Sequence, residues 1–198
     1  MWEAIDAAES KPFGFMPFRP GPGVGGHCSP IDPSYLPWRV TQSLGLTFRF
    51  VELANEVNEH MPDYVVRRLV SALNDQERSM KGSRILVAGV AYKRTTGDDR
   101  ESPSGRVIEL LTEQHADVVV RDPHVDPERS HVLPPGPPGW SSPPTRCARP
   151  TSCSSSSTTT PSTCSSRGRG EYVLDTRRCT SGTNVEHLLE PDRRHASR

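Results

Sequence analysis

Apolar residues in the first part of the chain follow a helical spacing. Between residues 50 and 73, large apolar side chains recur at every fourth position, namely at Leu53, Val57, Met61, Val65, Leu69 and Leu73. This step places them on one helix face, which is predicted to be core or a subunit interface. Pro62 lies within the run and predicts a break, with a second helix beginning after His60. A shorter helix is predicted over residues 36–44.

The spacing changes from residue 81 onward. Residues 84–92 form an apolar run rich in β-branched side chains, which predicts a buried strand. A polar loop over 93–101 precedes Ser102 and Pro103, which are typical of a helix start, and residues 116–122 predict a second strand. Strand, helix and strand in this order are typical of a βαβ unit with a parallel pair. The predicted fold class is therefore α/β.

The last third of the chain departs from a globular composition. Residues 133–170 consist largely of Pro, Ser, Thr and Gly. Such a tract cannot bury enough apolar area to offset the entropy lost on ordering, so disorder is predicted here. Residues 171–178 return to a strand-like pattern. The α/β unit is therefore expected to be interrupted and incomplete.

Composition and charge exclude several classes of protein. The 198 residues carry 24 basic and 24 acidic side chains and only 33% hydrophobic residues. Balanced charge argues against a nucleic-acid or membrane-surface binder, and no apolar run is long enough to span a bilayer. The start of the chain lacks a signal-peptide pattern, so a soluble, cytoplasmic protein is expected. The five cysteines include no Cys-x-x-Cys pair, which favours neither a disulfide framework nor a zinc site.

Residues 11–32 are rich in Gly, Pro and Phe. Such positions disfavour regular structure and let the backbone approach a ligand closely. Residues 21–26 formally fit Gly-x-Gly-x-x-Gly, but no strand precedes them and Cys-Ser-Pro follows, so they are not interpreted as a dinucleotide fingerprint.

Several ordered motifs resemble the UDP-glucose/GDP-mannose dehydrogenase family. They are Gly-Gly-His-Cys-Ser-Pro-Ile-Asp-Pro at 25–33, Ala-Asn-Glu-Val-Asn-Glu-His-Met-Pro at 54–62, and Val-Ala-Tyr-Lys at 90–93 with Asp-Asp-Arg-Glu-Ser-Pro at 98–103. The segment Lys-Pro-Phe-Gly-Phe-Met-Pro-Phe at 11–18 is most similar to the branch that oxidises UDP-N-acetylhexosamines. The agreement extends from residue 1 to about residue 130.

The resemblance implies oxidation of a nucleotide-sugar C6 alcohol to a carboxylate through two hydride transfers to NAD. Cys28 matches the nucleophile that forms a thiohemiacetal and then a thioester, and Asp32 matches the assisting acid. Gly23, Gly25 and Gly26 would let backbone N–H groups approach the nucleotide-sugar. Two alternatives stay open: Cys28 is structural, or Asp32 starts a turn or caps the helix that follows.

Three basic residues match family positions further along the chain. Lys93 would contact the substrate, Arg100 a phosphate or the cofactor, and Arg177 the UDP group. The alternative for Lys93 and Arg100 is two solvated charges on a polar loop. Residues 94–97 depart from the family pattern, which puts the geometry of this loop in question.

The family pattern divides the chain into two domains. Residues 1–80 are expected to be a remnant of the central helical domain, with a homodimer contact through 50–73. Residues 81–198 are expected to form a Rossmann-like parallel-sheet domain that binds the UDP-sugar, interrupted at 133–170. Because the family's NAD-binding domain does not precede Met1, little or no turnover is expected from the chain alone. A non-catalytic dimerising or nucleotide-sugar-binding fragment and a degraded reading frame without a stable product are the rival interpretations.

A shifted reading frame would explain the unusual tract. Read one base early, serine codons of the form TCN become Phe, Leu, Ile or Val codons, and cysteine codons become Leu, Met or Val codons. With suitable third bases, residues 147–163 would then encode an apolar strand and loop similar to those of the family. The frame would be restored near Gly170. A natural disordered linker is the alternative.

Overall fold

The computed structural model describes residues 1–11, 13–26, 28–47, 49–93, 95–132, 162–165, 172–177 and 185–189. The helices are α1 (Trp2–Glu9), α2 (Cys28–Leu44), α3 (Arg49–Glu59), α4 (Met61–Asp75) and α5 (Pro103–Glu113). The strands are β1 (Arg84–Ala88), β2 (Asp117–Arg121), β3 (Ser162–Ser165), β4 (Tyr172–Asp175) and β5 (Val185–His187).

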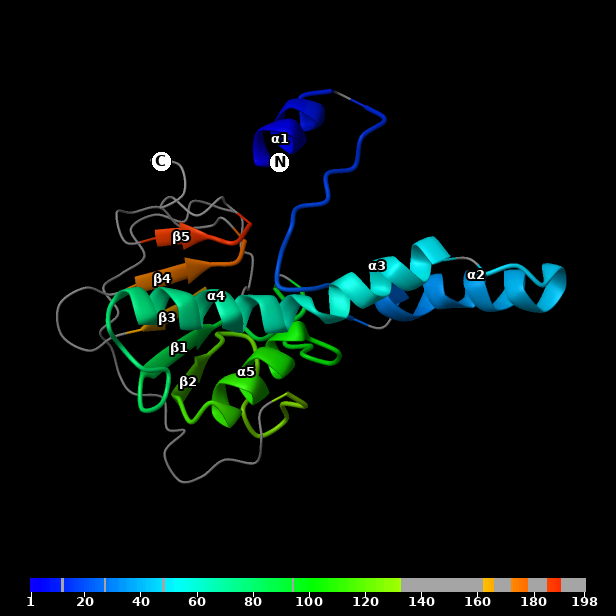
Figure 1. Cartoon of the computed structure of the whole chain (residues 1–198). Helices are drawn as coiled ribbons and strands as arrows, with labels where there is room; N and C mark the ends of the chain where they lie inside the picture. Colours follow the sequence, from blue (N-terminus) through cyan, green and yellow to red (C-terminus); the bar gives the residue numbers. More distant parts are fainter. Residues whose placement is uncertain are drawn as a thin grey trace.

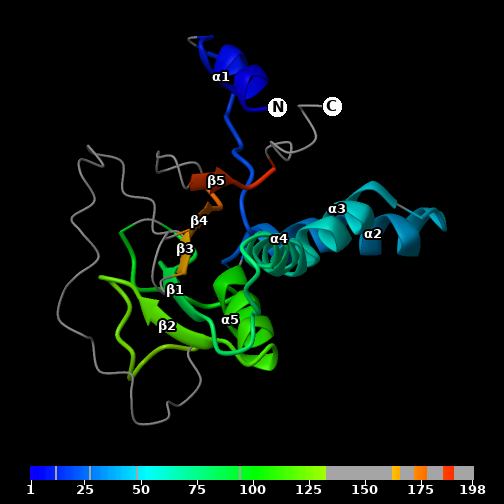
Figure 2. The ribbon, with the colours of Figure 1, turned by 60° about the vertical axis from the view of Figure 1, so that its left-hand side comes forward.

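The strands form one mixed sheet with the order β2-β1-β3-β4-β5. The pairs β1/β2 and β4/β5 are parallel, whereas β3 runs antiparallel to both of its neighbours. Consequently β1, β2, β4 and β5 all point the same way, and only β3 is reversed. Both α4 and α5 lie on one face of this sheet (Figures 1 and 2). The expected α/β class, the parallel βαβ pair and the strand within 171–178 are confirmed.

The helical part extends away from the sheet. In Figure 1, α2 and α3 lie side by side and project beyond the end of α4, and α1 stands apart near the N-terminus. The predicted break is confirmed, because α3 ends at Glu59 and α4 begins at Met61 with Pro62 in its first turn. Proline is tolerated there because first-turn N–H groups have no partner within the helix.

The predicted start of the helix at 36–44, which corresponds to α2, was wrong. The structure begins α2 at Cys28, not near residue 36, and so includes 28–32, which was expected to lack regular structure. Pro33 and Pro37 lie inside this helix and each removes one backbone hydrogen bond. Packing against α3 supports α2, where Asn55 Nδ2 donates to Ser34 Oγ at 3.1 Å.

The core lies between the sheet and its two helices. Apolar side chains of α4 and α5 pack against β1 and β4, and the fully buried members include Leu69, Leu73, Ile85, Val87, Val107, Leu111 and Leu174. The apolar residues predicted to share one helix face are therefore divided. Val65, Leu69 and Leu73 on α4 are core residues, whereas Leu53 and Val57 on α3 are exposed. A partly buried ion pair between Arg68 and Glu186, with a hydrogen bond from Tyr172 Oη to Glu186 at 2.7 Å, joins α4 to the β4–β5 edge.

The low-complexity tract contributes one strand. The expectation of disorder over 133–170 was wrong for Ser162–Ser165, which forms β3 between β1 and β4. Backbone groups of the two neighbouring strands satisfy it on both sides, which compensates for a sequence with little apolar character. The rest of the tract lies outside the described residues. None of the helices described has the length and hydropathy that crossing a bilayer requires.

Candidate active site

The candidate site lies at the carboxyl edge of the parallel strands. Beyond β1 the chain continues through 89–92 to Lys93, which is exposed, and beyond β4 it continues to Thr176 and the half-buried Arg177. In open α/β sheets this edge binds ligands, because the strand-to-helix loops converge there. Two of the three predicted basic residues, Lys93 and Arg177, therefore follow strand ends on the same edge.

A carboxylate at the end of β2 fixes the turn that leads to Lys93. One oxygen of Asp122 accepts from the backbone N–H groups of Val90 at 2.8 Å and Ala91 at 3.1 Å, and the other accepts from His124 N at 2.8 Å. Tyr92 N in turn donates to Asp98 O at 3.1 Å. The backbone leading to Lys93 is thus held by hydrogen bonds to Asp122, which is distant in sequence, and to Asp98 in the loop that follows.

The glycine-rich loop lies directly against this edge. A Cβ on Gly21 would stand 2.6 Å from Cζ of Arg177, and one on Gly23 would stand 3.0 Å from Cβ of Pro103. On Gly26 it would stand 2.7 Å from Cε2 of Tyr92. Close contact with the sheet domain and a positive φ together favour glycine at positions 23 and 26, whereas the atoms near Gly21 belong to the flexible end of Arg177. Their expected contact with a nucleotide-sugar stays a prediction.

The loop ends at the predicted nucleophile. Cys28 is a free, exposed thiol and the first residue of α2, and Asp32 is exposed one helical turn further on. Residues four apart lie on the same face of a helix, so the structure brings the two side chains to one face. The interpretation of Asp32 as a turn or cap residue was wrong, because it lies within α2.

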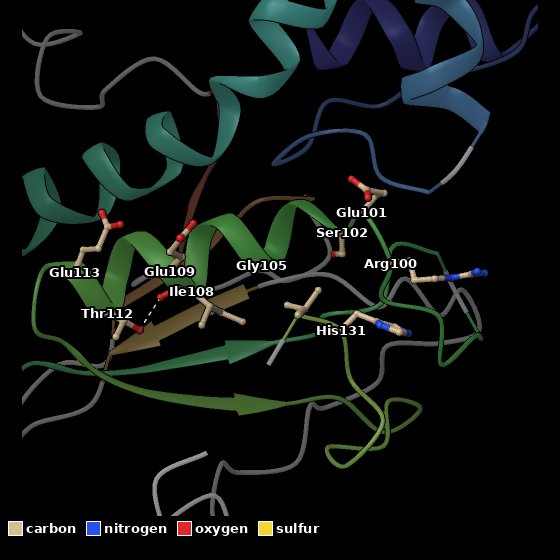
Figure 3. Close-up of a pocket in the computed structure, with 10 residues that line it drawn as sticks. Arg100, Glu101, Ser102, Gly105, Ile108, Glu109, Thr112, Glu113 and His131 are labelled. Carbon is tan, nitrogen blue, oxygen red and sulfur yellow. Dashed lines mark hydrogen bonds between the residues drawn. The ribbon is translucent and has the colours of Figure 1, made fainter. Parts of the chain in front are cut away.

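Arg100 lies on the β1–α5 loop and is already paired. Its Nε and Nη2 donate to the two carboxylate oxygens of Asp98 at 2.8 and 2.7 Å, and this hydrogen bonding raises the pKa of the guanidinium. Figure 3 shows Arg100 at one end of a cavity of about 800 Å³ beside α5, with His131 nearby and Glu109 and Glu113 further along the helix. Cys28 does not line this cavity.

The described residues do not fit a dinucleotide cofactor. The Gly21–Gly26 run is not preceded by a strand, and Gly21, Gly25 and Gly26 closely approach protein atoms, which leaves no open cradle at these positions for a pyrophosphate. Arg100, the residue expected to reach the cofactor, is engaged by Asp98. Nor do three or more His, Cys, Asp or Glu side chains gather as a metal centre within the part of the chain described.

Three residues of the site received no role from the sequence. Asn58 Oδ1 accepts from Val24 N at 2.7 Å, Tyr92 contacts the glycine loop, and Asp122 holds the β1 turn. Asn58 and Tyr92 lie within the family-like motifs at 54–62 and 90–93, and this position could have marked them as site residues. Asp122 offered only its position at the end of a predicted strand.

This arrangement defines a class: an α/β protein with a Rossmann-like sheet whose carboxyl edge receives a cysteine-bearing glycine loop from a helical segment. Two models of one family match the chain, the UDP-glucose/GDP-mannose dehydrogenase central domain over residues 1–60 and the UDP binding domain over residues 86–181. The chain belongs to the UDP-glucose/GDP-mannose dehydrogenase family.

Individual relatives agree with this assignment. UDP-N-acetyl-D-mannosamine dehydrogenase of Methanococcus maripaludis is 38% identical over 126 residues, which cover 64% of this chain and 28% of the relative. UDP-N-acetyl-D-glucosamine 6-dehydrogenase of Pseudomonas aeruginosa is 36% identical over 64% of this chain and 29% of its own length. The solved UDP-D-ManNAc dehydrogenase of Pyrococcus horikoshii superposes with a TM-score of 0.53 at 31% identity, covering 63% of this chain and 29% of that one. The match thus spans under a third of each relative.

Proposed function

We propose that the chain is the part of a nucleotide-sugar 6-dehydrogenase that binds the UDP-sugar and carries the nucleophile. The supporting observation is the position of the loop that leads to Cys28, which lies against the sheet edge bearing Lys93 and Arg177. Two cations at this edge suit the diphosphate of a UDP-sugar. The proposed substrate is a UDP-N-acetylhexosamine or UDP-glucose, and the proposed location is cytoplasmic.

In this proposal Cys28 acts on the C6 aldehyde. The thiolate sulfur forms a bond to the aldehyde carbon while the aldehyde oxygen takes up a proton, which gives a thiohemiacetal. Asp32, on the same face of α2, relays a proton. Once the adduct has been oxidised to a thioester, water breaks the carbon–sulfur bond and releases the carboxylate and the thiol.

NAD is the proposed acceptor of both hydrides in the whole reaction. Neither the glycine run nor Arg100 offers a site for it, and none of the roles given to Cys28, Asp32, Lys93 and Arg177 depends on a bound cofactor. We therefore expect the chain, mixed with NAD and a UDP-sugar, to produce little or no NADH. NADH production that disappears in Cys28→Ser would overturn this expectation.

Binding of UDP tests the cationic edge without requiring turnover. Lys93→Ala should weaken binding of UDP, measured by isothermal titration, by about tenfold or more, as expected for losing a charge-assisted hydrogen bond. Lys81→Ala is the matched control, because Lys81 is an exposed lysine that precedes β1 and so lies toward the opposite edge. Equal affinities for the two variants would contradict the proposed site.

A second candidate function is a non-catalytic, dimerising fragment. Exposed apolar side chains gather on the paired helices α2 and α3, including Tyr35, Leu36, Trp38, Phe50, Leu53 and Val57. We propose that a second copy of this chain covers them. We also propose that the chain divides into a helical region, 1–80, which would make this contact, and a nucleotide-sugar domain, 81–198. The later part of the 50–73 region is not available for this contact, because Val65, Leu69 and Leu73 are core residues.

Molar mass by light scattering over a range of concentrations tests the dimer. Leu53→Ser should shift the chain toward monomer, whereas its neighbour Glu52→Ser, also exposed on α3, should leave the mass unchanged. A parent chain that stays monomeric at every concentration would contradict the proposal. Loss of cooperative unfolding in the parent would instead favour a degraded reading frame.

A further inference from the structure

The loop that carries Cys28 touches the sheet domain through glycines. At Gly25, a Cβ would lie 2.7 Å from the backbone oxygen of Glu101, 2.9 Å from Cβ of Tyr92 and 3.0 Å from Cδ of Pro103. At Gly26 it would lie 2.7 Å from Cε2 and 2.9 Å from Cδ2 of the Tyr92 ring. Tyr92 therefore contacts two consecutive backbone units just before the start of α2.

The ring is attached to a fixed piece of backbone. Tyr92 follows directly on Val90 and Ala91, whose N–H groups are bound by Asp122, and its own N–H donates to Asp98. The side chain is half-buried. A ring held in this way can act as a support for the loop, because its own main chain is held by hydrogen bonds to two other segments.

The loop is also held by the helical part. Asn58 of α3 accepts a hydrogen bond from Val24 N at 2.7 Å. Gly26 has a φ of +89°, a conformation that side chains with a Cβ rarely adopt. The loop is thus held by contacts with α3 and with Tyr92 at residues 24–26.

We propose that Tyr92 is a positioning residue for Cys28. Its ring contacts Gly26 and so fixes where α2 begins, and with it the place of the thiol. At Gly26 the contact is made by ring carbons, so the aromatic ring and not the hydroxyl is the required group. The inference rests on the proposed function only for the role of the thiol as nucleophile. The mechanical link between Tyr92 and the start of α2 is independent of it.

Hydrogen exchange on the full chain tests the link, followed by mass spectrometry of peptides that span 21–36. Tyr92→Ala should speed exchange of these peptides about tenfold, because local opening becomes easier, and Tyr92→Phe should exchange like the parent. Tyr172→Ala is the matched control: this half-buried tyrosine is the first residue of β4, at the end of the strand away from the loop, and its loss should destabilise the domain without loosening the loop.

Two results would overturn the inference. The first is unchanged exchange over 21–36 in Tyr92→Ala. The second is an equal increase in Tyr92→Ala and Tyr172→Ala, which would mean that general destabilisation and not the ring contact loosens the loop. Because exchange requires neither substrate nor cofactor, failure of the proposed chemistry would leave this test intact.

Discussion

Replacing Gly25 by alanine tests the contact between the glycine loop and the sheet domain by adding a single methyl group. Gly25 does not adopt a positive φ, so the substitution introduces no backbone strain of that kind. The added Cβ would meet the carbonyl oxygen of Glu101 at 2.7 Å and Cδ of Pro103 at 3.0 Å. Neither atom belongs to the end of a flexible side chain, so the loop itself must move.

The expected cost is that of overpacking a close contact, about 1–3 kcal/mol. In a chain of this size each kcal/mol lowers Tm by about 2–4 °C. Because the loop can also leave the sheet without unfolding it, the substitution should be examined by thermal unfolding and by hydrogen exchange over residues 21–28. At least one of the two should change.

Gly105→Ala provides the matched control. Gly105 lies within α5, where alanine is favoured over glycine by about 0.5–1 kcal/mol. Its added Cβ would meet only the side chain of Val132, at 3.2 Å. This variant should therefore match or exceed the stability of the parent. If Gly25→Ala matched Gly105→Ala in both Tm and exchange, the close contact described for the loop would be refuted.

Three further substitutions test the packing and the hydrogen bonds around the site. Leu69→Ala should lower the free energy of unfolding by about 2–5 kcal/mol, because Leu69 is fully buried, whereas Leu53→Ala should change it by under about 0.5 kcal/mol in the monomer; similar urea midpoints would contradict the division of the helical stripe. Asp122→Ala, which removes both acceptor oxygens, should cost about 1–3 kcal/mol and speed exchange of the residue 90 and 91 amides, and unchanged exchange there would count against the turn being held by this carboxylate. Glu186→Gln should cost about 1–3 kcal/mol in urea unfolding by leaving Arg68 partly buried without its charge partner, and an unchanged urea midpoint would contradict a stabilising role for this ion pair.

Apolar spacing and helix-start residues predicted β1, α5 and β2, which pack against elements close to them in sequence. The apolar run at 84–92, the Ser102-Pro103 helix start and the run at 116–122 correspond to β1, α5 and β2. Ser102 indeed caps α5, its Oγ accepting from Ser104 N at 3.4 Å. These elements form from information within each segment, which is why spacing and capping sufficed.

Two elements depended on distant partners: α2 was predicted only over residues 36–44, and β3 was not predicted. The Gly, Pro and Phe content of 11–32 argued against regular structure up to residue 32, but α2 begins at Cys28, and packing on α3 supports it. The polar residues Ser162–Ser165 have little strand tendency, yet β1 and β4 offer backbone partners on both sides. Tertiary contacts override local preference in both cases.

The site was predicted only as far as its motifs reach. Cys28 and Asp32 were predicted as site residues by resemblance, and the structure adds only that they share one face of α2. The contacts of Gly26 with Tyr92 and of Val24 with Asn58 join segments that are far apart in sequence, so no spacing rule could indicate them.

The order of strands in the sheet has a consequence for the rate of folding. The elements α4, β1, α5 and β2 follow one another within residues 61–121, so most of their contacts are local, whereas β3, β4 and β5 join from residues 162–187. Local contacts close short loops at little entropic cost and form early, and pairings between distant segments form late. A substitution such as Leu111→Ala in the early unit should therefore slow folding, whereas Leu174→Ala in β4 should mainly speed unfolding.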